Sequence, residues 1–239
     1  MQDNYIGDIG DYGKYGLLRT VCAEGLSLAV NWYRVMPKKT GKQDDGKFIN
    51  YLSKHQCYRE YDPELFDRLH KIVLLDKDRC LERIERENMF DAVYFSDEVC
   101  ADRAGWHCRA LEITKAADVV FLDPDNGLET EKMFLTGSAT DKHVRWMELK
   151  DYYARGQNVV LYQHRPQMMT KERCIENIMQ YQKNFLLADH VMLLEFPKYT
   201  NRFYFMFLHD NAKNSFEKVC RSMVKNWWKN DFCREIVLE

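Results

Sequence analysis

Short apolar runs alternate with helix-like stretches along this chain, and the alternation ends in two closely spaced strands. Four runs are rich in the β-branched and aromatic residues of buried strands, and they lie at 26–35, 92–95, 119–122 and 159–162. Segments 191–196 and 202–208 are too close together for a crossover helix, so we expect an antiparallel hairpin. The pattern predicts an α/β fold, with a three-layer, doubly wound and mainly parallel sheet that ends in this hairpin.

Helices are predicted between these strands, where apolar residues recur at helical spacing. Asp11 is placed to cap a first helix, and Pro63 is placed at the start of a later one. Further helices are predicted over 48–52, 77–88, 104–117, 144–154, 174–186 and 216–227. In the helix over 104–117, we expect Trp106, Ala110 and Ile113 to face inward.

Length and charge limit the classes of protein that this chain can represent. Its 239 residues, 46% of them hydrophobic and 13% aromatic, can bury one large core. We therefore expect a single α/β domain over 1–239, with the glycine-rich segment and helix of 1–25 packed on it. A net charge of -2 argues against a protein that wraps nucleic acid through its global charge, although a local basic patch is compatible with a nucleic-acid partner.

The cysteines and the hydropathy pattern indicate a cellular compartment. Eight cysteines are scattered without a C-x-x-C pair, which fits neither a zinc site nor a dense disulfide framework, so we expect buried thiols in a reducing compartment. No apolar run approaches the roughly 18 residues that span a bilayer. The sequence therefore predicts a cytoplasmic protein without a membrane partner.

The apolar run at 119–122 ends abruptly in the acidic turn D-P-D-N-G, whose proline and glycine cannot continue a strand. Open α/β sheets bind ligands just outside the carboxyl ends of their strands. We therefore predict Asp123, Asp125 and Asn126 as catalytic residues, with Glu129 close behind them. The alternative is an ordinary acidic surface turn, in which proline, asparagine and glycine serve only the backbone.

The N-terminal stretch G-D-I-G-D-Y-G-K-Y-G holds four of the eleven glycines within ten residues. Glycines permit close approach of the backbone to a ligand, and a lysine at a helix start suggests an anion site. We predict that Gly10, Asp11, Lys14 and Tyr15 bind a small-molecule cofactor. The spacing is not that of a Walker A loop. The alternative is that the glycines serve packing alone.

A third set of candidate residues follows the strand at 159–162. Its end carries His164 and Arg165, and neighbouring strand ends would bring both close to Asp123. The histidine can act as acid, base or ligand, and the arginine can bind phosphate or a cofactor carboxylate. The basic loop at 38–46 offers three lysines for phosphate, or it is a solvated loop.

These features together resemble the class I S-adenosylmethionine-dependent methyltransferase fold. In the amino-methylating branch, the fourth strand ends in (Asp/Asn)-Pro-Pro-(Tyr/Phe), which corresponds here to the letters D-P-D-N from Asp123 to Asn126. Some ribosomal-RNA adenine methyltransferases of that branch also have a glycine- and lysine-containing helix start, which Gly13-Lys14-Tyr15 resembles. The resemblance implies S-adenosylmethionine as cofactor and methyl transfer to an amine, in a nucleic acid or another substrate.

The cofactor motif of that fold is degenerate in this chain. The G-x-G turn after the first strand is missing from residues 31–37, and the aromatic residue that would stack a target base is Asn126. The chain also resembles a widespread group of bacterial proteins of unsettled function, which share its G-D-I-G-D-Y-G-K-Y-G-L-L-R and F-L-D-P-D-N-G-L-E motifs. That second resemblance covers nearly the whole chain and implies no chemistry.

Two other hypotheses use the same residues. Asp123, Asp125 and Glu129 supply hard oxygen ligands for Mg²⁺ or Mn²⁺, as in a metal-dependent nuclease or phosphohydrolase. Their motif also resembles the opening D-x-D of haloacid-dehalogenase phosphatases, although it stands far from the N-terminus here. The last hypothesis is a Rossmann-like binding module without catalysis.

Overall fold

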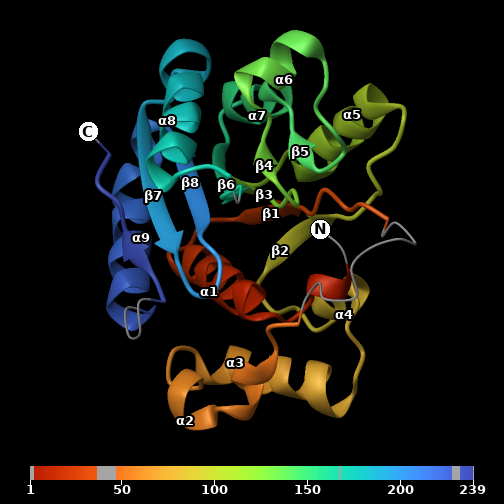
Figure 1. Ribbon diagram of the computed structural model, residues 1–239, viewed down its shortest axis with the longest axis vertical. Coiled ribbons are helices and arrows are strands. Elements are labelled where there is room, and N and C mark those ends of the chain that lie inside the picture. Colours follow the sequence, from red (N-terminus) through yellow and green to blue (C-terminus); the bar gives the residue numbers. More distant parts are fainter. Residues whose placement is uncertain (1–2, 37–46, 167, 228–231, 239) are drawn as a thin grey trace.

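The computed structural model describes residues 3–36, 47–166, 168–227 and 232–238. Its centre is a seven-stranded sheet of spatial order β2-β1-β3-β6-β8-β7-β9 (Figure 1). The strands are β1 (Leu28–Asn31), β2 (Ala92–Phe95), β3 (Val119–Leu122), β6 (Asn158–His164), β7 (His190–Phe196), β8 (Arg202–Leu208) and β9 (Arg234–Glu235). A separate two-stranded sheet joins β4 (Gly127–Leu128) to β5 (His143–Val144) in parallel.

The strand directions confirm the prediction of a mainly parallel α/β sheet with an antiparallel hairpin. β1 pairs in parallel with β2 and β3, and β3 pairs in parallel with β6. β8 is antiparallel to both β6 and β7, and β9 is antiparallel to β7. The carboxyl ends of β3 and β6 therefore lie side by side, as the sequence indicated.

Helices cover both faces of the sheet. They are α1 (Ile9–Ala23), α2 (His55–Tyr58), α3 (Pro63–His70), α4 (Leu81–Arg86), α5 (Arg103–Thr114), α6 (Glu131–Thr136), α7 (Trp146–Ala154), α8 (Lys171–Tyr181) and α9 (Lys213–Trp227). In Figure 1, α1 and α9 lie on one face with α3 beneath α1, and α5, α7 and α8 lie on the other. Alternate residues of β3 enter the two cores, Val119 and Phe121 on the α1 side, Val120 and Leu122 on the α7 side.

Several predicted boundaries are wrong for identifiable reasons. Asp8 rather than Asp11 caps α1, because the Asp8 carboxylate accepts hydrogen bonds from the first backbone N–H groups of the helix. The first strand covers four residues instead of ten, and it ends before Tyr33, whose φ of 47° breaks the extended backbone. Ile113 is 46% exposed, while its predicted companions Trp106 and Ala110 are buried.

Other differences concern shorter elements. Only Leu81–Arg86 is helical within 77–88, and the segment at 48–52 forms a short 3₁₀ turn over Asn50–Ser53. The helix predicted at 174–186 is α8 followed by a π-helical turn over Gln182–Leu186. β4, β5 and α6 were not predicted, and the basic loop at 38–46 lies outside the described residues. Among the described residues, no helix is long and apolar enough to cross a bilayer.

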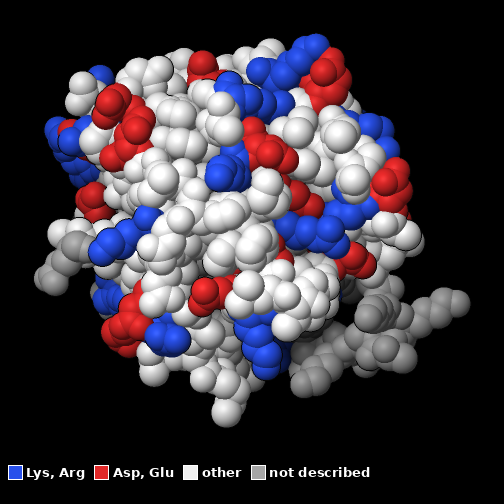
Figure 2. Space-filling model, turned by 90° about the horizontal axis from the view of Figure 1, so that it is seen from above, with Lys and Arg blue, Asp and Glu red and all other residues white. Residues whose placement is uncertain are grey.

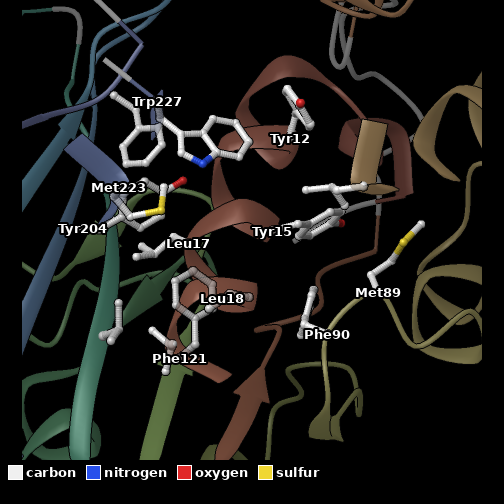
Figure 3. Close-up of a cluster of buried hydrophobic side chains, with 14 of the residues drawn as sticks. Tyr12, Tyr15, Leu17, Leu18, Met89, Phe90, Phe121, Tyr204, Met223 and Trp227 are labelled. Carbon is white, nitrogen blue, oxygen red and sulfur yellow. The ribbon is translucent and has the colours of Figure 1, made fainter. Parts of the chain in front are cut away.

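The glycines of the N-terminal motif allow other elements to approach α1 closely. Gly10, Gly13 and Gly16 follow one another at intervals of three and so share one side of the helix. A Cβ atom at Gly10 would lie 2.5 Å from Arg202 Nε, and one at Gly13 would lie 2.7 Å from Phe196 Cδ1. A Cβ atom at Gly16 would overlap the Trp227 ring. Figure 3 shows Trp227 beside this helix, with Leu17 and Met223 below it. These glycines therefore serve the close packing of α1 against its neighbours.

The close contact at Gly16 is testable. Gly→Ala in a helix ordinarily raises stability by about 1 kcal/mol. Because a Cβ at Gly16 would overlap Trp227, we expect Gly16→Ala to lower the free energy of unfolding by about 1–3 kcal/mol, measured by urea denaturation. In a Trp227→Leu background the same substitution should cost less, since the smaller side chain makes room. An equal cost in both backgrounds would refute the contact.

Candidate functional site

A cleft of about 300 Å³ opens at the carboxyl ends of β3 and β6, between the start of α1 and the turn that follows β3. Its wall combines charged side chains with three aromatic rings. The charged and ionisable residues are Asp8, Asp11, Lys14, Asp123, Asp125, Lys142, His164 and Arg202, and the rings belong to Tyr5, Phe48 and Tyr162. The three separate sequence motifs thus contribute to one cleft, which lies at the sheet edge where ligands of open α/β sheets bind.

The wall of this cleft contains a buried lysine that lies between two carboxylates. Lys14 Nζ donates hydrogen bonds to Asp11 Oδ1 at 2.9 Å and to Asp123 Oδ2 at 2.8 Å. All three residues are less than 5% exposed. The other oxygen of Asp11 accepts from Gly7 N and from the Tyr15 hydroxyl, each at 3.0 Å. This cluster joins the first turns of α1 to the end of β3, which lie more than a hundred residues apart in the chain.

Burial and charge act in opposite directions on the ionisation of this cluster. Burial alone would lower the pKa of Lys14, but the carboxylates of Asp11 and Asp123 outweigh it and raise that pKa well above its usual value. Lys14 therefore remains an ammonium at neutral pH. Burial raises the pKa of Asp123, although Lys14 opposes the shift. The cluster holds a carboxylate at the end of β3 in a site with little water.

A second buried ion pair borders the cleft. Arg202, the first residue of β8, lies beside the α1 cap, with its Nη2 atom 3.7 Å from Asp8 Oδ2. Its guanidinium also donates to the Lys198 carbonyl at 3.1 Å. Burial raises the pKa of Asp8, and Arg202 opposes that rise. The pair fixes the start of the helix against the sheet and leaves charge of both signs on the cleft wall.

The turn after β3 forms the outer edge of the cleft. Asp125 pairs with Lys142 at 3.0 Å, and the backbone N–H of Asn126 donates to the Lys142 carbonyl at 3.0 Å. The Asn126 amide lies 3.4 Å from Nε2 of His143 in β5. The small β4–β5 sheet therefore fixes the backbone of a turn in which Asn126 is exposed.

His164 is the last residue of β6 and stands opposite Arg202 in the ladder. Burial lowers its pKa, and the positive charges of Arg202 and Arg165 lower it further, so the ring is neutral at pH 7. Tyr162, two residues earlier, also borders the cleft, and burial raises its pKa to about 12. A neutral imidazole on this wall can accept a proton from a ligand.

Three predicted residues lie away from the cleft wall. Arg165 donates to the Met169 carbonyl at 2.8 Å, and Glu129 accepts from the backbone N–H of Trp146 at 2.6 Å. Tyr15 lies behind Asp11, to which its hydroxyl donates. The residues that sequence reasoning missed are Lys142, Tyr162 and Arg202. The position of Arg202 depends on the pairing of β8 with β6.

The predicted metal ligands are not arranged as one site. Asp123 and Asp125 pair with Lys14 and Lys142, and Glu129 points to α7. Within the described ranges, no group of three or more His, Cys, Asp or Glu side chains is placed to hold a metal ion. A cation at this position would have to displace two ammonium groups from their carboxylates.

No family model matches this chain, and neither a curated protein nor a solved structure does. The chemistry of the cleft is therefore the main guide to function.

The buried lysine is testable by substitution. Lys14→Met keeps the length of the side chain but leaves Asp11 and Asp123 buried without this ammonium, so we expect a loss of about 3–5 kcal/mol in the free energy of unfolding. Lys115→Met removes a comparable ammonium from an exposed pair with Glu112 and should cost no more than about 1 kcal/mol. Similar losses in the two variants, measured by chemical denaturation, would contradict the importance of the cluster.

The shifted pKa of His164 predicts a dependence of stability on pH. Because the folded protein lowers this pKa from about 6.5, the unfolded chain binds more protons, and stability falls as the pH drops below that value. His164→Gln removes this titration. We expect the melting temperature of the wild type to fall more steeply than that of His164→Gln between pH 7 and pH 5. Parallel slopes for the two proteins would show that His164 is not held in its neutral form.

Proposed function

We propose that the protein is a methyltransferase-like enzyme that acts on an amine in the cleft at the ends of β3 and β6. The observation that carries this proposal is the position of Asp123. This carboxylate follows a middle strand of the sheet, lines the cleft, and is held in place by Lys14. In the amino-methylating enzymes that the sequence resembles, the acid of the (Asp/Asn)-Pro-Pro-(Tyr/Phe) motif follows the corresponding strand.

The charge of the cleft supports a cationic ligand. Among the described residues of the wall, four acidic side chains face three cationic ones, and His164 is neutral. The sulfonium and the ammonium of S-adenosylmethionine can pair with these acidic side chains, whereas a phosphate ester would meet fewer cations than acids among them. The balance favours the methyl-transfer hypothesis over the metal-dependent phosphohydrolase.

The side chains of the cleft fit the chemical groups of this cofactor. Arg202 suits a carboxylate, and Asp8 suits an ammonium. The rings of Tyr5, Phe48 and Tyr162 offer faces for an adenine. The usual place of the cofactor, over a glycine turn after the first strand, does not fit, because Trp32 and Tyr33 are fully buried there. The cofactor would therefore lie within the cleft.

When bound, S-adenosylmethionine supplies an electrophilic methyl group, and methylation of a neutral amine releases one proton. Asp123 binds the amine by accepting a hydrogen bond from its N–H, which directs the nitrogen lone pair into the cleft. The neutral ring of His164 carries an acceptor nitrogen that could accept a hydrogen bond from the amine, and the proton would leave with the product.

Asp123→Asn separates cofactor binding from methyl transfer. We expect the variant to bind S-adenosylhomocysteine nearly as well as the wild type, because Asp123 contacts the amine. Transfer of labelled methyl groups to a panel of amines should fall by about two to three orders of magnitude. Asp97→Asn, which alters a half-exposed acid just after β2, is the matched control and should retain activity.

Each result of that experiment has a defined meaning. Loss of transfer with retained binding in Asp123→Asn supports the proposal. If the wild type binds S-adenosylhomocysteine but transfers no methyl group to any amine, the result favours the hypothesis of a binding module without catalysis. If the wild type binds no S-adenosyl ligand, the proposed function is wrong.

A further inference from the structure

A second cavity of about 320 Å³ adjoins the reaction cleft. Asn126 and His164 line both spaces, so these two side chains form the boundary between them. Beyond this boundary the wall is mainly apolar, with Leu128, Met133, Met169 and Ile178 among its residues. The second cavity thus differs in character from the charged cleft that it adjoins.

The wall between the two spaces is well ordered. Gln163 in β6 accepts a hydrogen bond from Leu128 N at 2.8 Å and donates one to the Asn126 carbonyl at 3.1 Å. Gly127 lies against the same side chain with a φ of 108°, where a Cβ atom would overlap the Gln163 amide. The backbone of the turn is therefore fixed, and the side chains of Asn126 and His164 project from fixed positions.

Part of the lining of the second cavity consists of flexible methionine side chains. Met133 belongs to α6, a helix without a buried residue, and Met169 precedes α8. Both methionines are half-buried. Unbranched thioether side chains adjust to ligands of different shape, so these two methionines suit a cavity that accepts apolar groups.

Charge is nearly absent from this second wall. Glu129 is the single carboxylate among the residues that line it, and its side chain is already bound to the backbone N–H of Trp146. His143 and His164 are neutral at pH 7, because burial lowers the pKa of each. None of the described residues that line this space is a lysine or an arginine, so they offer no cationic side chain to a phosphodiester.

We infer that the second cavity binds the apolar part of the amine substrate, which is a small alkylamine or arylalkylamine. Its nitrogen lies at Asp123, its chain passes between Asn126 and His164, and its apolar end lies against Met133 and Ile178. This inference rests on the proposed function. It assigns the acidic cleft to the amine and the uncharged cavity to the remainder of the molecule.

On the face that Figure 2 shows, acidic and basic side chains of the described residues are interspersed.

The test is a calorimetric titration with straight-chain amines from methylamine to hexylamine. Each buried methylene contributes about 0.8 kcal/mol, so we expect the affinity of the wild type to rise roughly fourfold per methylene until the cavity is filled. Met133→Trp should abolish this rise, because the indole fills the cavity. Met133→Ala should extend the rise to longer amines. Met168→Trp is the matched control, since Met168 is 99% exposed and should leave the series unchanged.

The same titrations with Asp123→Asn distinguish the inference from the proposed function. If amines bind in a manner that depends on Asp123 but is independent of chain length, the cavity assignment is wrong and the proposed function stands. If affinity rises with chain length but ignores Asp123, the proposed function is wrong. If no amine binds, or if Met168→Trp weakens binding as Met133→Trp does, the inference is overturned.

Discussion

The ammonium of Lys14 is the interaction on which the rest of this structure depends. It bridges a carboxylate in the first helix and a carboxylate at the end of β3, all three nearly inaccessible to solvent. Two buried acids this close would repel each other and lose their hydration without a shared cation. The bridge therefore fixes α1 over the sheet edge. The glycines of α1 complete this arrangement, because they let Arg202, Phe196 and Trp227 approach the helix backbone.

That arrangement creates two adjacent spaces of different chemistry. Among the described residues, the cleft beside α1 has four acidic and three cationic side chains, which suits ligands that carry an amine or a sulfonium. The neighbouring cavity is almost uncharged and is lined in part by methionine side chains. Asn126 and His164 stand between them. A substrate with a basic nitrogen and an apolar body matches this division better than a polyanion does.

The sequence predicted those parts of the fold that depend on local pattern. The apolar runs located β2 and β3 to the residue, and the short connection between β7 and β8 identified their hairpin. Asp123 and His164 were predicted to be close because neighbouring parallel strands end at one edge.

The capping role of Asp8 was missed, since Asp8 and Asp11 lie less than one helical turn apart. The role of Arg202 was missed because it reaches the site through the long-range pairing of β8 with β6. Glu129 was misplaced because β4, only two residues long, turns its side chain toward α7.

The central claim is that the cleft recognises a cationic adenosyl ligand rather than an anionic one. The most direct measurement compares two ligands that share adenosine and differ in charge, S-adenosylmethionine and ATP, titrated calorimetrically into the wild-type protein with and without Mg²⁺. The four acidic and three cationic side chains among the described residues of the cleft predict that S-adenosylmethionine binds under both conditions, and more weakly as salt is added, while ATP does not bind. Binding of ATP that requires Mg²⁺, without binding of S-adenosylmethionine, would contradict the account and restore the metal-dependent hypothesis.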